Sequence, residues 1–207
     1  MRDWEKPLRE TYGRIAAAWM AQHQADTWWV PGAEAFAAML PPGGAVLDVG
    51  CAGGYKAEWL TRRGFQVGGV DLSPEMVALA RERLPQCRFE AIGVMDLDRL
   101  GETYDGVFCQ AMLLHVPKAE IAEAFASLAR RLKPGGLLSV SVKEIRPGQG
   151  EEEDKTEDDV GYEYTRRFSY FTAAELRALV EGAGLEVVEE RATNSGRSVW
   201  LEIVGRS

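Results

Sequence analysis

The sequence predicts an α/β fold in which helices cover both faces of a mostly parallel sheet, and three observations lead to this prediction. Short apolar runs alternate with longer segments of helical periodicity, so most strands need helical crossovers. The chain has 207 residues, 46% hydrophobic and 27% charged, which suits a single domain over 1–207. Only seven residues, 192–198, separate the last two strands. They allow a hairpin but no crossover, so the final strand should be antiparallel.

The expected elements follow in order along the chain. Two helices, at about 8–22 and 32–40, form an N-terminal helical cap (1–40) before a Pro-Pro-Gly-Gly turn. Ser73 is the expected N-cap of a later helix, with Pro74 at its first position. Strands are expected at 45–49, 66–70, 88–91, 106–109, 137–142, 185–191 and 199–204. Further helices are expected at 55–63, from 74 onward, at 118–132 and at 173–183.

Charge and composition exclude several classes of protein. The 24 Lys and Arg against 32 Asp and Glu leave a net charge of −8, which argues against nucleic-acid binding. No apolar run approaches the roughly 18 residues of a membrane span, and the N-terminus lacks a signal-peptide core. Three cysteines at unrelated spacings favour a reducing compartment, and two histidines make a metal site unexpected. We expect a cytoplasmic monomer or homodimer without a membrane partner.

The loop after the first strand is the first candidate site. Residues 48–54 (Asp-Val-Gly-Cys-Ala-Gly-Gly) are small where the chain enters a helix, so backbone N–H groups can approach a ligand. Asp71 ends the second strand 17 residues beyond Gly54, where a carboxylate can accept both hydroxyls of an adenosine ribose. A tight turn without a ligand, and Asp71 as a helix cap, are the alternatives.

Several runs carry a resemblance to a known family: Val-Leu-Asp-Val-Gly-Cys-Ala-Gly-Gly at 46–54, Gly-Val-Asp-Leu-Ser at 69–73, Leu-Lys-Pro-Gly-Gly at 132–136, and Tyr-Asp-Gly-Val-Phe at 104–108 leading to Leu-Leu-His-Val-Pro at 113–117. Over about residues 11–205 the chain resembles the class I S-adenosylmethionine-dependent methyltransferases. The resemblance implies a three-layer Rossmann-like sandwich with a seven-stranded sheet, S-adenosyl-L-methionine as cofactor and a small-molecule acceptor. The runs 113–117, 167–176 and 200–204 are similar to a methyltransferase type 11/12-like, bacterial tellurite-resistance-like branch.

Two positions depart from the family pattern. Ala52 stands where a second glycine is usual, and alanine is tolerated there only if φ is negative. Gly93 stands where many members place an acid against the adenine amino group. Leu72 and Met95 are therefore expected to face the ring, with hydrogen bonds from the backbone near Val94 or from Asp96 if the loop is shifted.

The resemblance carries over a set of cofactor-binding candidates from the N-terminal cap and the loops after the strands. They are Tyr12, Trp19, Asp48, Gly50, Ala52, Gly53, Asp71, Leu72, Met76, Val94, Met95 and Gln110. A nicotinamide dinucleotide is the alternative cofactor, for an oxidoreductase. The loop lacks the G-x-G-x-x-G spacing, and Asp48 would repel a pyrophosphate but accommodate an α-amino group. A non-catalytic S-adenosylmethionine-binding regulatory subunit is the non-enzymatic alternative.

Candidates for catalysis and acceptor binding are fewer. His115 follows the fourth strand and could act as a general base, or simply pack among its apolar neighbours. The adjacent Trp28 and Trp29 either plug the base of the sheet or wall an aromatic acceptor pocket. Arg166 and Arg167 could orient an anionic acceptor or pair with the acidic run just upstream.

The segment 146–164 holds that acidic run: seven acids and one lysine lie between Glu151 and Asp159. It lacks strong periodicity and cannot bury a core of its own, yet it follows the fifth strand at the ligand-binding edge. We predict that it forms a mobile acidic lid over the acceptor. A solvated surface loop is the alternative.

Overall fold

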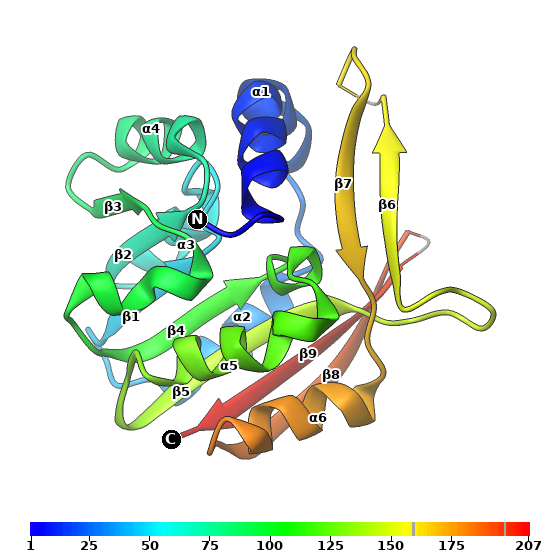
Figure 1. Ribbon diagram of the computed structural model, residues 1–207. Coiled ribbons are helices and arrows are strands. Elements are labelled where there is room, and N and C mark those ends of the chain that lie inside the picture. Colours follow the sequence, from blue (N-terminus) through cyan, green and yellow to red (C-terminus); the bar gives the residue numbers. More distant parts are fainter. Residues whose placement is uncertain (159, 197) are drawn as a thin grey trace.

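A seven-stranded sheet forms the centre of the molecule, in the strand order β3-β2-β1-β4-β5-β9-β8 (Figure 1). The computed structural model describes residues 1–158, 160–196 and 198–207. The first five strands pair in parallel, while β9 is antiparallel to both β5 and β8. The predicted sheet and its antiparallel final strand are therefore confirmed. The strands are β1 Ala45–Val49, β2 Gln66–Asp71, β3 Arg88–Ala91, β4 Tyr104–Gln110, β5 Leu132–Lys143, β8 Glu186–Ser195 and β9 Ser198–Arg206.

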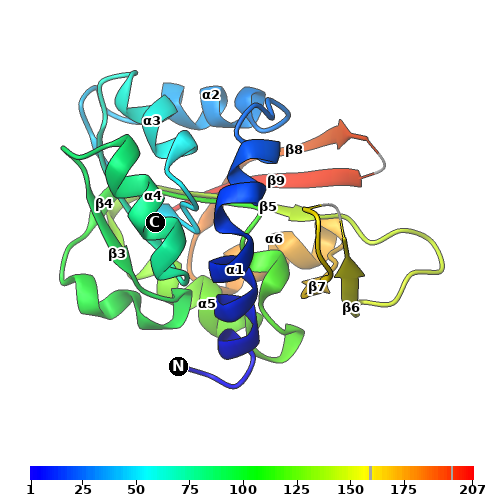
Figure 2. The ribbon, with the colours of Figure 1, turned by 90° about the horizontal axis from the view of Figure 1, so that it is seen from above.

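Helices cover both faces of this sheet, as Figure 2 shows. Helices α2 and α3, with α4, pack on one face, and α5, α6 and the short helix η1 pack on the other. Helix α1 belongs to neither layer and contacts α4 on one side and strand β7 (Tyr164–Ser169) on the other. The helices are α1 Glu5–His23, α2 Val30–Met39, α3 Tyr55–Thr61, α4 Pro74–Arg83, α5 Ile121–Ala129 and α6 Ala173–Gly182, with 3-10 turns η1 Val94–Leu100, η2 Leu113–His115 and η3 Lys118–Glu120.

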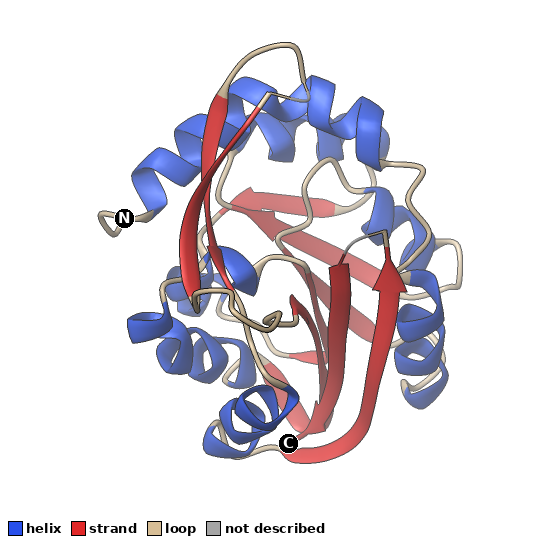
Figure 3. Cartoon of the chain, turned by 90° about the vertical axis from the view of Figure 1, so that its right-hand side faces the viewer, coloured by secondary structure: helices blue, strands red, loops and turns tan. Residues whose placement is uncertain are grey.

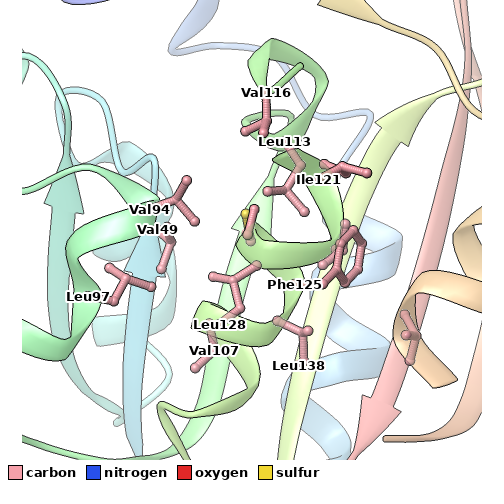
Figure 4. Packing of buried hydrophobic residues seen from close by; sticks show 14 of the residues in the cluster. Val49, Val94, Leu97, Val107, Leu113, Val116, Ile121, Phe125, Leu128 and Leu138 are labelled. Carbon is pink, nitrogen blue, oxygen red and sulfur yellow. The ribbon is translucent and has the colours of Figure 1, made fainter. Parts of the chain in front are cut away.

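Alternating residues of the central strands supply the two layers of the core. In β4, Val107 and Cys109 face the α5 side, whereas Phe108 faces α2 and stacks on Phe36 at 5.5 Å between ring centroids. Figure 4 shows Val107 and Leu138 of the sheet meeting side chains of α5 and η1. Because both faces are buried, the strands read as continuous apolar runs rather than as alternating ones.

The long helix predicted at 118–132 is wrong in its extent. The chain forms η3, then α5, and leaves the helix after Ala129. Strand β5 begins at Leu132 instead of residue 137, because Leu132 pairs with Tyr104 before a shift in register. The apolar pattern of the sequence predicted only residues 137–142 of this strand.

The acidic segment also differs from its prediction as a segment without regular structure. Strand β6 (Glu152–Glu157) pairs antiparallel with β7 (Tyr164–Ser169), and Figure 3 shows this hairpin reaching the long N-terminal helix. Ion pairs between the strands support the pairing, since Arg167 binds Asp154 opposite it, with 3.3 Å between Nε and Oδ1, and Arg166 binds Glu157 diagonally. Asp159, the last acid of the run, lies outside the described residues.

Gly106 offers a test of the packing between β4 and α2. A Cβ at this position would come within 2.7 Å of Phe36 Cζ, so Gly106→Ala should lower the free energy of unfolding by about 1–3 kcal/mol. Gly182→Ala in α6 is the matched control, because nothing lies within 4 Å of its added methyl group. That change should be neutral or stabilising by about 0.5–1 kcal/mol. Equal denaturation midpoints for the two variants would contradict this packing.

Candidate active site

The carboxyl ends of the strands meet in a cavity of about 310 Å³. Its wall runs from the end of β3 past β2, β1 and β4 to the end of β5 and the start of β9. Strand order reverses between β1 and β4, where an α/β sheet characteristically binds its ligand. The roof comes from α1 and β7, which contribute Glu5, Tyr12, Trp19, Arg166 and Phe168.

The glycine-rich loop forms the middle of this wall. Gly50 has φ +74°, and a Cβ there would come within 2.6 Å of the Met112 side chain. The expectation that Ala52 has a negative φ is wrong, because its φ is +47°. Its backbone N–H donates to Asp71 Oδ2 at 2.9 Å. The left-handed conformation costs an alanine about 1–2 kcal/mol, and this hydrogen bond stabilises it.

The Asp71 carboxylate lines the cavity, and backbone N–H groups of two loops donate to its oxygens. Oδ1 accepts from the backbone N–H of Ser73 at 2.9 Å, and Oδ2 accepts from Ala52. Burial raises the pKa of Asp71, and these backbone donors oppose the rise. A carboxylate has about four acceptor positions, so acceptor capacity remains for ribose hydroxyls in the cavity. Ser73, not Asp71, caps α4, since its hydroxyl accepts from the N–H of Met76 at 3.2 Å.

A buried acid and a buried base lie beneath the loop. Asp48 is 1% exposed, and neither carboxylate oxygen has a hydrogen-bond partner among the described residues. Burial raises its pKa to about 7, an effect that nearby Lys56 opposes and Asp71 strengthens. Lys56 Nζ donates to the Gln110 carbonyl at 3.2 Å and lines the cavity.

His115 lies in the cavity wall with both ring nitrogens engaged. Nδ1 is 2.7 Å from the carbonyl of Arg167, so it must donate, and Nε2 accepts from the Tyr12 hydroxyl at 2.8 Å. Arg166 Nη1 donates to the same hydroxyl at 3.1 Å. Burial, and next the Arg166 charge, lower the pKa of His115 to about 3. This geometry favours a role in holding Tyr12 over the expected role of general base.

The two tryptophans have different surroundings, one at the cavity and one in the core. Trp28 lines the cavity and stacks on Trp200, with 4.1 Å between ring centroids and 12° between planes. Trp29 is 4% exposed in the core, packed edge-on against Trp59. The two arginines pair with the acidic run: Arg166 binds Glu157 while lining the cavity, whereas Arg167 pairs with acids on the surface.

Most residues expected from the sequence do meet at this cavity. Nine cofactor candidates line it: Tyr12, Trp19, Gly50, Ala52, Asp71, Leu72, Met76, Val94 and Gln110. Asp48, Gly53 and Met95 lie outside the wall, and so does Asp96, which is exposed.

Sequence reasoning missed five charged residues in the wall: Glu5, Arg9, Asp26, Lys56 and Lys143. No spacing marks them, and charged side chains usually predict an exposed position. In the part of the chain that the structure describes, no group of three or more His, Cys, Asp or Glu side chains could hold a metal ion. Nor is any described helix long and apolar enough to cross a membrane.

Comparisons with known proteins decide the family. Residues 46–136 match the model of a methyltransferase domain. A ubiquinone biosynthesis O-methyltransferase from Xanthomonas axonopodis pv. citri (strain 306) is 38% identical over 171 residues, covering 74% of this chain and 68% of that protein. The chain belongs to the class I S-adenosylmethionine-dependent methyltransferases. A second such relative, from Xanthomonas campestris pv. campestris (strain B100), is 43% identical, but the match spans 46% of its length.

Solved structures confirm the Rossmann-like methyltransferase fold. The 1,6-didemethyltoxoflavin-N1-methyltransferase of Burkholderia thailandensis, with bound S-adenosylhomocysteine, has a TM-score of 0.79 at 23% identity, covering 99% of this chain and 89% of its own. CalS10 of Micromonospora echinaspora, an amino pentose methyltransferase with bound S-adenosylmethionine, has a TM-score of 0.67 at 27% identity, covering 90% and 94%. The chain is thus an S-adenosylmethionine-dependent enzyme, and the nicotinamide alternative falls. The tellurite-resistance-like branch stays a prediction.

The cavity of this methyltransferase fits its cofactor. The free acceptor positions of Asp71 suit the ribose hydroxyls, and the positive-φ turn at Gly50 and Ala52 leaves room for close backbone approach. The Gln110 Oε1 atom in the cavity wall is a buried acceptor without a partner among the described residues, and Asp48, also without one, lies beneath the wall on the neighbouring strand. Cationic ligand groups such as an α-amino group would satisfy such acceptors.

The hydrogen bonds of His115 predict how stability depends on pH. The ring is neutral when folded because its pKa is lowered to about 3, whereas the unfolded side chain binds a proton near pH 6.5. The unfolded state therefore binds more protons between these values, and stability falls as pH drops below 6.5, by up to about 1.4 kcal/mol per pH unit. Chemical denaturation of His115→Gln should show a shallower loss between pH 6.5 and 4.5.

The same variant tests the base hypothesis. A loss of turnover of about 100-fold or more, with an unchanged pH dependence of stability and unchanged cofactor affinity, would contradict the holding role. It would restore His115 as the general base.

Proposed function

We propose that this methyltransferase methylates a hydroxyl oxygen on an aromatic small molecule that carries a negative charge. The observation that carries the proposal is Lys143, whose ammonium group lies over two aromatic rings in the cavity wall. The relatives named ubiquinone biosynthesis O-methyltransferase support oxygen as the accepting atom. When bound, the cofactor supplies an electrophilic methyl group, and the protein must align the acceptor with it.

Lys143 lies at the end of β5, opposite Trp200 of β9. Its Nζ is 4.6 Å from the ring centroid of Phe168 and 5.5 Å from that of Trp200. Within the described chain, no carboxylate lies within salt-bridge distance of this ammonium group. Burial, and then the charges of Arg166 and Lys155, lower the pKa of Lys143 to about 8. A half-buried cation without an anion is a ready binding group for a carboxylate or phenolate.

Flat aromatic surfaces surround this cation. Phe168 stacks on Tyr170, with 13° between ring planes, and the Trp28–Trp200 stack forms another wall of the same cavity. Aromatic faces bind a planar ring by offset stacking or edge contacts. The acceptor end therefore combines surfaces for a ring with a charge for an anionic substituent.

The acceptor hydroxyl would release its proton to solvent and bind as a phenolate, so its oxygen could take the methyl group without a base supplied by the chain. The chain's own groups then serve to position the reactants. Arg166, Tyr12 and His115 form a hydrogen-bonded series that holds α1 against β7 above the cavity. A cavity roofed in this way excludes water from the acceptor oxygen, which favours an in-line displacement. The cofactor-binding roles expected for Asp48, Gln110 and the loop residues belong to this proposal.

We place the enzyme in the cytoplasm, as a monomer or homodimer that does not bind nucleic acid. Its free cysteines Cys51, Cys87 and Cys109 suit a reducing compartment, and its net charge of −8 disfavours nucleic acid.

Lys143 tests the acceptor class through binding. The probes are 6-hydroxy-2-naphthoate and its neutral carboxamide, titrated calorimetrically into protein saturated with S-adenosylhomocysteine. Wild-type protein should bind the carboxylate about 10-fold more tightly or better, as a charge-assisted contact implies, and Lys143→Met should abolish that preference. The preference should also fall as pH rises above 8, where Lys143 loses its charge.

Lys133→Met is the control, because this lysine pairs with Asp105 at 2.8 Å far from the cavity and should keep the preference. Equal binding of the two probes by wild-type protein, or a preference that survives Lys143→Met, would refute the anionic acceptor. Failure to bind S-adenosylhomocysteine itself would instead count against the cavity as the cofactor site.

The β6–β7 hairpin is the proposed lid, and its contacts with α1 hold it closed. Tyr162 Oη donates to the Arg14 carbonyl at 2.5 Å, and Arg14 Nη2 donates to the Glu163 carbonyl at 3.0 Å. The Arg14 guanidinium also lies over the Tyr162 ring, 4.4 Å from its centroid. Opening the lid therefore requires breaking contacts near its tip.

Removing these contacts should expose the hairpin to proteases. Arg14→Ala removes the hydrogen bond to the Glu163 carbonyl and the contact with the Tyr162 ring, whereas the bond from Tyr162 Oη to the carbonyl of residue 14 remains. It should increase the rate of cleavage between residues 148 and 164 about 5-fold, the effect of losing one hydrogen bond. S-adenosylhomocysteine with the naphthoate probe should slow cleavage in wild-type protein. Cleavage that neither the substitution nor the ligands alter would assign the hairpin to the fixed structure.

A further inference from the structure

Glu5, in the first turn of α1, is a buried acid in the cavity wall with one oxygen unused. The residue is 1% exposed. Its Oε2 accepts from the backbone N–H of Arg2 at 2.6 Å, while Oε1 has no hydrogen-bond partner among the described residues. A buried acceptor of this kind is costly to leave unsatisfied, so it normally marks a site where a donor binds.

The Oε1 atom of Glu5 lies next to Gly93. A Cβ on Gly93 would lie 2.6 Å from Glu5 Oε1 and 3.3 Å from Leu72 Cδ1. The carboxylate of α1 therefore occupies the space next to the backbone that follows β3. Glycine at position 93 leaves room for an acid that comes from elsewhere in the chain.

The order of the strands at the cavity indicates which part of the cofactor would lie beside Glu5. Asp71, at the end of β2, suits the ribose, and the loop at 50–53 lies on its β1 side. The base must then extend toward the other neighbour, β3, where Ile92, Gly93 and Val94 form the wall. These residues and Leu72 offer apolar contacts but no side-chain acceptor.

We infer that Glu5 Oε1 accepts a hydrogen bond from the exocyclic amino group of the cofactor's adenine. Of the described side chains lining this end, Arg9 carries only donors, and both Asp71 oxygens are committed to backbone and ribose. The N-terminal cap thus recognises the adenine base in addition to covering the cavity. A 6-oxo base, which presents a carbonyl oxygen there, would be repelled.

The test compares two nucleosides by calorimetry: S-adenosylhomocysteine and S-inosylhomocysteine, which differ at C6. Wild-type protein should prefer the adenosyl compound by about 30-fold or more, since a site built around one hydrogen bond rejects the mismatched group strongly. In Glu5→Gln, the single amide oxygen cannot accept from both Arg2 N–H and the adenine. The preference should fall to about 3-fold or less, through weaker adenosyl binding and stronger inosyl binding.

Two controls separate base recognition from general damage. Glu10→Gln changes an exposed acid on the same helix and should keep the full preference. Asp71→Ala should weaken both nucleosides alike, because both carry the ribose. If Glu5→Gln also weakens both alike, or leaves the preference intact, Glu5 has a structural role only and the inference is wrong.

Discussion

The site depends on one carboxylate that ties two loops together. Asp71 accepts from the backbone of Ala52 after β1 and of Ser73 at the start of α4, so it fixes the shape of both ligand-binding turns. The left-handed conformation at Ala52 is unfavourable without that bond. The same carboxylate also lines the cavity. If Asp71 binds the ribose of the cofactor, as proposed, loop geometry and cofactor recognition share a single side chain.

A second set of hydrogen bonds joins the roof to the sheet. It runs from Glu157 of β6 through Arg166 of β7 to Tyr12 of α1, and from there to His115 after β4. These elements are far apart in sequence, and they meet only because α1 lies across the carboxyl edge of the strands. The acidic run, which looks like solvated surface in the sequence, thus contributes through Glu157 to the wall of the cavity.

The sequence predicts a structural feature where the cause of that feature lies within a short segment of the chain. The strands, their parallel order and the position of Asp71 at the end of β2 follow from apolar runs and from spacing, which short segments carry. The sign of φ at Ala52 is set by Asp71, and β6 is set by opposite charges on β7; both are tertiary causes. Glu5 and Lys143 were missed for a related reason. A single sequence assigns charged residues to the surface, and only the packed fold shows which of them are buried.

The cavity wall carries charges of both signs. Glu5 and Asp71 line it near the ends of β3 and β2, and Lys143 and Arg166 line it at the end of β5 and on β7, while Lys56 lies between them at the β1–β4 switch point. In a partly desolvated cavity such charges act more strongly than in water. In the function proposed above, the cofactor binds toward Asp71 and Glu5, and the anionic acceptor binds toward Lys143 and Arg166. The two ends of the cavity would then differ in charge, so each reactant would be placed by groups that do not suit the other.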